Sequence, residues 1–106
     1  MTQESSRVEN RIPIRVTVDL ASLEPRTPAQ QATTENVSAH GARILTRKRW
    51  EPNARLNVRS LLGSLRSRAR VVYCEPTNSG EFAVGLELSA IAGEWTSPQN
   101  FRPTSR

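Results

Sequence analysis

The stretch LRSRARVVYCEPTNSGEFAVGLEL, residues 65–88, decides the fold class of this chain. In the first half, the arginines at 66, 68 and 70 alternate with small or apolar residues, and in the second half large apolar residues alternate with small or charged ones. Such alternation has the two-residue period of a β-strand. The apolar face of the second half consists of Phe82, Val84, Leu86 and Leu88. The turn-forming residues between the halves are Pro76, Asn78, Ser79 and Gly80. The stretch therefore predicts a β-hairpin, in which Gly85 allows a tight bend or a bulge.

The rest of the chain repeats this pattern in shorter pieces. Residues 12–20 alternate most strictly, with one apolar face made of Ile12, Ile14, Val16, Val18 and Leu20. Further short strands are expected at 31–37, 42–46 and 55–59, the last with Leu56 and Val58 inward. Beyond the hairpin, a short helical turn is expected at 92–95. About six short strands separated by turn residues predict an all-β fold, either a small β-barrel or a sandwich.

Length and composition set the organisation of the chain. A chain of 106 residues suffices for one domain with one modest core, and with 5% aromatic residues that core is built from aliphatic side chains. No apolar run is long enough to span a membrane, and the polar N-terminus does not resemble a secretory signal. We therefore expect a cytoplasmic protein without membrane insertion. We divide it into a flexible arm (1–11), a barrel domain (12–96) and a disordered tail (97–106).

The charge of the chain favours an anionic partner. The formal net charge is +5, and all basic residues except Lys48 are arginine. The planar guanidinium group suits phosphate groups and the edges of guanine. Charge alone does not identify the partner.

The sequence contains few of the residues that disulfides, metal sites and catalytic triads require. Cys74 is the only cysteine and His40 the only histidine, so we expect no internal disulfide, no metal site and no catalytic triad. The sequence thus predicts a binding module that is not an enzyme and has no cofactor. Cys74 is expected to act as a small buried hydrophobe. Trp50 and Trp95 are expected to be local anchors that cover the open ends of the barrel.

Two short motifs contain the candidate binding residues. Asn36-x-Ser38-x-x-Gly41 combines side chains that stabilise turns with a glycine that permits positive φ or a close approach to the backbone. This pattern predicts a tight connection between two strands, and the same turn could present polar groups to a ligand. Arg7-x-x-x-Arg11 lies directly before the first strand. It is either a solvated segment or a pair of guanidinium groups for phosphate and guanine.

Together, in this order and spacing, the motifs resemble the RxxxR and [D/N]xSxxG signatures of the bacterial PilZ domain. The resemblance continues through residues 54–58, 68–73 and 83–88, and so runs from about Arg7 to Leu88. It implies a six-stranded antiparallel β-barrel. It also implies a receptor for the second messenger cyclic di-GMP that relays the level of this ligand to an effector protein, which the sequence does not identify.

The resemblance also assigns the ligand contacts by position. These are Arg7, Arg11, Asn36, Ser38, Gly41 and Arg43. On this interpretation, bound phosphates order the mobile arm against the barrel. The chain departs from many members at Val8, where they have a further arginine, and Glu9 adds a negative charge between the two arginines of the motif.

Two alternatives remain open. The first is a degenerate PilZ-like adaptor that acts through protein contacts and binds no nucleotide, which Glu9 and Val8 favour slightly. The second is a small basic RNA-binding barrel, a class that usually carries aromatic residues on its strands for base stacking. Only Tyr73 and Phe82 lie on predicted strands, which argues against RNA. No DNA binding is expected.

Overall fold

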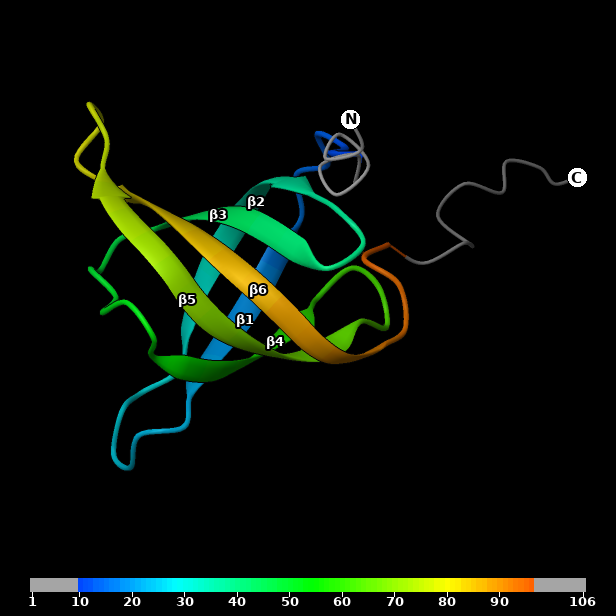
Figure 1. The fold of residues 1–106 in the computed structure, drawn as a ribbon, viewed down its shortest axis with the longest axis horizontal. Helices are drawn as coiled ribbons and strands as arrows, with labels where there is room; N and C mark the ends of the chain where they lie inside the picture. The colour runs from blue at the N-terminus through cyan, green and yellow to red at the C-terminus, as the bar shows by residue number, and fades with distance from the viewer. Residues whose placement is uncertain (1–9, 97–106) are drawn as a thin grey trace, which may run out of the picture.

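The computed structural model describes residues 10–96, which form a closed antiparallel β-barrel (Figure 1). The strands are β1 (Thr17–Ser22), β2 (Gln30–Val37), β3 (Gly41–Thr46), β4 (Arg55–Ser60), β5 (Arg66–Pro76) and β6 (Phe82–Ala92). Around the barrel their order is β1-β2-β3-β6-β5-β4. The described part of the chain contains no helix, hence none that could cross a membrane. The prediction of an all-β, six-stranded antiparallel barrel is confirmed.

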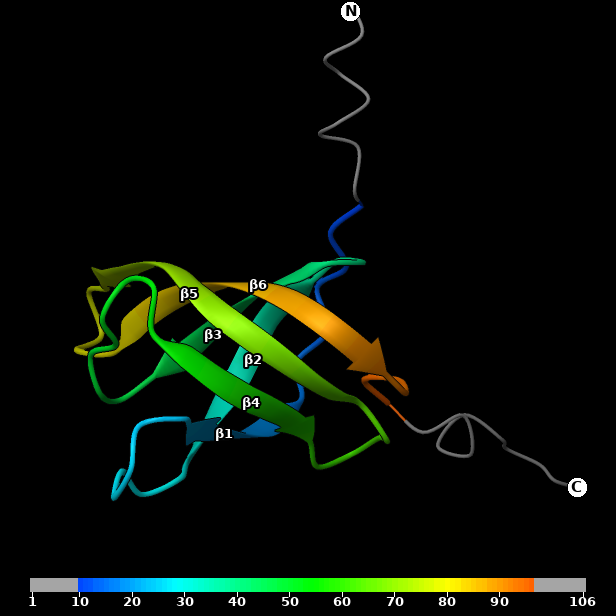
Figure 2. The same cartoon turned by 60° about the horizontal axis from the view of Figure 1, so that its bottom comes forward.

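The hairpin predicted at 65–88 is present as β5 and β6, the two longest strands of the barrel. Thr77 closes its turn, because both its backbone N–H and its hydroxyl donate to the carbonyl oxygen of Glu81, at 2.9 and 3.0 Å. Gly80 has a φ of 90°, a conformation that glycine adopts without strain. In Figure 2 the two strands curve together across the barrel beside β4.

Alternating aliphatic side chains fill the barrel. The largest of those that are almost completely buried are Val18, Leu20, Ile44, Leu56, Val58, Val71 and Val84. Trp50 joins this core from the β3–β4 loop, and Trp95 packs against it half-buried. Cys74 also packs against the core but is half-buried, and its sulfur accepts a hydrogen bond from the backbone N–H of Trp50 at 3.4 Å.

The strand predicted at 12–20 is shorter than expected. Ile12 forms an isolated bridge with Val37, but β1 begins only at Thr17. Pro13 has no backbone N–H for a ladder, and the buried Thr34 hydroxyl holds the segment instead. This hydroxyl accepts a hydrogen bond from the N–H of Val16 at 2.9 Å and donates to the carbonyl of Ile14 at 2.5 Å.

We expect Thr34→Val to lower the free energy of unfolding by about 1–3 kcal/mol, because the buried N–H of Val16 loses its acceptor. Urea denaturation monitored by circular dichroism measures this loss. Thr34→Ser is the matched control, since it keeps the hydroxyl and should cost less. A valine variant as stable as the serine variant would contradict the role given to this hydroxyl.

The helical turn expected at 92–95 is absent. β6 runs to Ala92, and Gly93 then turns the chain with a φ of 84°. The backbone groups that follow form hydrogen bonds with the β4–β5 loop and not with one another in a helix. The N–H of Leu65 donates to the carbonyl of Glu94 at 2.8 Å, and the N–H of Glu94 donates to the Ser64 hydroxyl at 3.2 Å.

Candidate functional site

A β-bulge in β2 directs two polar side chains outward. Thr34 pairs with Ile44 and Asn36 pairs with Arg43, so Glu35 is an extra residue in β2. A bulge of this kind bends its strand and re-aims the side chains beside it. Here Glu35 and Asn36 are both partly exposed on the outer face, while Thr34 on one side of them is buried.

A second bulge, in β5, directs the side chain of Tyr73 to the outer face of the barrel. Val71 pairs with Leu86 and Tyr73 pairs with Gly85, which leaves Val72 as the extra residue. Val71 is completely buried, whereas Val72 is exposed and Tyr73 lies half-buried on the outer face. The bulge thus brings the Tyr73 ring to the side of the barrel where β3 and β6 lie.

Gly85 makes room for that ring. In register it lies between Arg43 of β3 and Tyr73 of β5. A Cβ atom added at Gly85 would lie 2.2 Å from Cε2 of Tyr73, so the ring occupies the space that a side chain would fill. The bulge that the sequence suggested at Gly85 therefore lies on the neighbouring strand, and the glycine serves the close approach of the ring.

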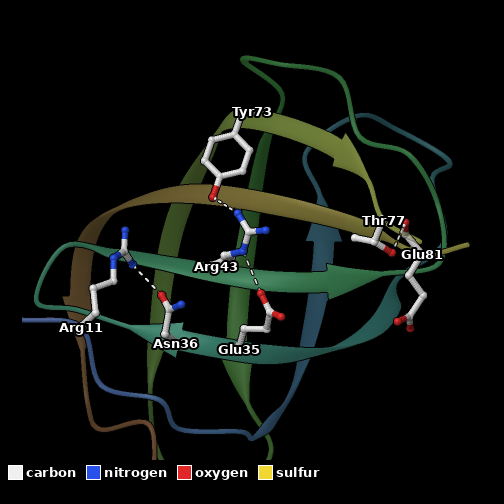
Figure 3. Close-up of polar contacts among 7 residues, drawn as sticks. All are labelled: Arg11, Glu35, Asn36, Arg43, Tyr73, Thr77 and Glu81. Carbon is white, nitrogen blue, oxygen red and sulfur yellow. Dashed lines mark hydrogen bonds and ion pairs between the residues drawn. The ribbon is translucent and has the colours of Figure 1, made fainter. Parts of the chain in front are cut away.

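Arg43 is held from two sides (Figure 3). Its Nε donates to Glu35 Oε1 at 2.7 Å, and its Nη1 donates to the Tyr73 hydroxyl at 2.8 Å. The guanidinium carbon lies 5.7 Å from the centre of the Tyr73 ring, within the range of a cation–π interaction. The hydrogen bonds to Glu35 and then Tyr73 raise the pKa of Arg43 above its ordinary value, so the group stays charged.

Arg11 lies on the same outer face. Its Nη1 donates to Asn36 Oδ1 at 3.0 Å (Figure 3). The neighbouring Ile12 is fixed to Val37 by a backbone bridge. Arg11, predicted as the last residue of the arm, is therefore in contact with β2. Residues 1–9 of the arm, among them Arg7, lie outside the described residues, as does the predicted tail 97–106.

The turn predicted at 38–41 is confirmed. The backbone N–H of Ser38 donates to the carbonyl of Gly41 at 2.9 Å, and the Ser38 hydroxyl lies 3.4 Å from the same oxygen. Gly41 is outside the left-handed region, so its role is close packing. A Cβ atom there would lie 3.2 Å from the carbonyl oxygen of Leu86 and 3.9 Å from Nη2 of Arg11.

Five of the six predicted contacts therefore meet on one side of the barrel. We call this group the rim site: Arg11, Asn36, Ser38, Gly41 and Arg43. A cavity of about 530 Å³ adjoins it beside the turn, with Asn10, Ser38 and Trp95 in its lining. The site presents two guanidinium groups on an open surface, an arrangement that suits an anion too large to be enclosed.

Sequence reasoning missed Glu35 and Tyr73 as neighbours of Arg43. In the structure the inward residues of β2 change from even to odd numbers, from Ala32 and Thr34 to Val37, but residues 33–36 are all polar, so the sequence alone does not show this change. Such a change of phase indicates a bulge between them. The sequence does not mark Tyr73 either, since the apolar run at 71–74 hides the phase of β5.

Fold and site together define a small β-barrel domain that presents arginines beside a tight turn on one outer face. The comparison with protein families adds that the PilZ domain model matches residues 2–94. The chain belongs to the PilZ domain family, as its motifs indicated. No curated protein shows a significant match to it.

Proposed function

We propose that this protein is a receptor for cyclic di-GMP that passes the level of this messenger to a partner protein. On this proposal it acts in the cytoplasm as a binding module and catalyses no reaction. The observation that carries the proposal is the rim site itself, in a PilZ domain. Arg11 and Arg43 lie on one outer face beside the turn at 38–41. Arg11 ends the RxxxR motif, and Arg43 lies two residues past the second motif, at a position that the resemblance to PilZ domains assigns to the ligand.

Arg11 is the primary anchor in this proposal. Asn36 uses one of its guanidinium donors and orients the group, while the side chain remains exposed. The remaining donors are directed to a phosphate group or to the O6 and N7 acceptors of guanine. Arg7 is proposed to supply a second guanidinium group from the arm, as the motif implies.

In this proposal the ligand shares the donors of Arg43 with Glu35 and Tyr73. Two nitrogen atoms of Arg43 already donate, one to Glu35 and one to Tyr73. An incoming phosphate or guanine therefore competes with the carboxylate of Glu35 for Arg43, in an ion pair that is partly exposed. Binding through Arg43 is thus weaker than binding through a free arginine would be.

Isothermal titration calorimetry with cyclic di-GMP tests this function, and cyclic di-AMP is the matched comparison. The two ligands share their phosphates, but adenine replaces the O6 acceptor with a donor. Cyclic di-AMP should bind at least about tenfold more weakly, since one good bidentate base contact is worth about 1–3 kcal/mol. Equal affinities for the two ligands would show that the site recognises only the phosphates and not the base.

We expect Glu35→Gln to raise the affinity for cyclic di-GMP. The substitution removes the negative charge that competes for Arg43. Because partly exposed ion pairs are worth about 0.2–1 kcal/mol, the gain should be about two- to fivefold. Glu51→Gln is the control, since it removes a carboxylate that pairs with Arg49 away from the site. A weaker ligand affinity in Glu35→Gln would mean that Glu35 supports binding.

The pairing of Arg43 with Glu35 also favours a second candidate, a PilZ adaptor that binds no nucleotide. In such an adaptor the Glu35–Arg43–Tyr73 contacts would stabilise the surface that a protein partner reads. Absence of heat in the titration, with an intact β-sheet spectrum, would support this candidate over the receptor.

A further inference from the structure

Five arginines form a cationic surface on the side of the barrel away from the rim site. Arg55 and Arg59 belong to β4, and Arg66, Arg68 and Arg70 belong to β5; Arg70 is partly exposed and the other four are exposed. We call this group the arginine face. In the order of strands, the β4–β5 pair lies across the barrel from the β2–β3 pair, with β1 and β6 between them (Figure 2).

The register places like charges directly opposite one another. Arg55 pairs with Arg70 and Arg59 pairs with Arg66 across the two strands. Like charges in directly opposed positions of a sheet repel each other. The face therefore holds concentrated positive charge that a bound anion would compensate.

Carboxylates neutralise only part of this charge. Asp19 pairs with Arg59 at 2.8 Å, and Glu87 pairs with Arg70 at 2.9 Å. Among residues 10–96, no carboxylate forms an ion pair with the remaining three, Arg55, Arg66 and Arg68. Their donors are available to an external ligand.

The face is also hollowed on both sides of Arg68. One hollow of about 590 Å³ is lined by Arg66, Arg68 and the Asp19–Arg59 ion pair, and its small apolar side chains are Ala21, Ala29, Ala90 and Ala92. A second hollow of about 220 Å³ has Arg55, Arg68 and Arg70 in its lining. The two hollows share Arg68, so an elongated ligand could occupy both.

We propose that the arginine face binds an acidic segment of a partner protein. Its carboxylates would pair with Arg66 and Arg68, and an apolar side chain between them would lie on the alanines of the larger hollow. This composition favours a polypeptide over a nucleic acid, because no aromatic side chain lines either hollow and bases would find no stacking surface. The proposal does not depend on cyclic di-GMP binding, because it uses other residues on another side of the barrel.

The test is fluorescence anisotropy of the full chain, without nucleotide, against a labelled peptide of alternating glutamate and leucine. A labelled oligouridylate of equal charge is the comparison. We expect the peptide to bind more tightly than the RNA. The double variant Arg66→Ala/Arg68→Ala should lose at least about tenfold in peptide affinity, since it removes two charge-assisted contacts.

The matched control is Arg15→Ala/Arg47→Ala, which removes the same charge from two exposed arginines outside this face. It should keep peptide affinity within about twofold if only local contacts matter. An equal loss in both double variants would show attraction by net charge alone and overturn the proposal. Failure of the peptide to bind, or tighter binding of the RNA, would also overturn it. Cyclic di-GMP titration of the same variants reports on the rim site separately.

Discussion

Arg11→Ala should weaken cyclic di-GMP binding by about thirtyfold or more, equivalent to about 2 kcal/mol. The substitution removes the guanidinium group that Asn36 orients at the edge of β2. It also leaves Asn36 without its donor, although that side chain is partly exposed and can bond to water. Calorimetry of the purified variant measures the effect, with thermal unfolding to confirm the fold.

Arg15→Ala is the matched control for this loss. Arg15 is an exposed arginine four residues along the chain, outside the rim site. Its removal changes the net charge equally and should change the affinity for cyclic di-GMP less than about threefold, since exposed charges are screened by salt. Similar losses in the two variants would contradict a specific role for Arg11.

Gly85→Ala should destabilise the barrel by about 1–3 kcal/mol, the usual cost of overpacking. The new Cβ atom would overlap the Tyr73 ring at 2.2 Å, so the ring must move, which disturbs the hydrogen bond between its hydroxyl and Arg43. The backbone itself tolerates alanine, because Gly85 does not have a positive φ. Urea denaturation measures the change in the free energy of unfolding.

A double-mutant cycle separates this contact from other effects of the substitution. In the Tyr73→Ala background the ring is gone, so Gly85→Ala should cost almost nothing. A loss of equal size in both backgrounds would place the strain elsewhere than at the Tyr73 ring. It would also remove the reason given for the glycine between Arg43 and Tyr73.

Most of the strands follow from the alternation of side chains, because a closed barrel buries one face of each strand. The hairpin at 65–88 is present over its predicted length, and Leu56 and Val58 point inward as expected. The prediction was wrong at residues 13–16, where a proline and the Thr34 hydroxyl replace the regular ladder. A hydrogen bond between a side chain and the backbone of a residue far away in the sequence produces no periodic pattern in the sequence.

The candidate site was predictable in its motif residues and not in its neighbours. The spacing of Asn36, Ser38 and Gly41 predicts the turn that the structure contains. The contacts of Arg43 depend instead on two bulges. The bulge in β2 adds Glu35, which itself contacts Arg43, and the bulge in β5 adds Val72 and brings the next residue, Tyr73, to Arg43. Because a bulge depends on pairing with another strand, the local sequence does not determine which side chains it brings together.

The most direct test of the central claim is an NMR titration of the isotope-labelled chain with cyclic di-GMP. The account predicts that backbone amide shifts concentrate at Arg11, Asn36, the turn at 38–41 and Arg43. It also predicts that the amides of β4, on the far side of the barrel, change little. Shifts centred on β4 and on Arg66 and Arg68 of β5, or no shifts at a saturating concentration of ligand, would contradict the rim site as the receptor for cyclic di-GMP.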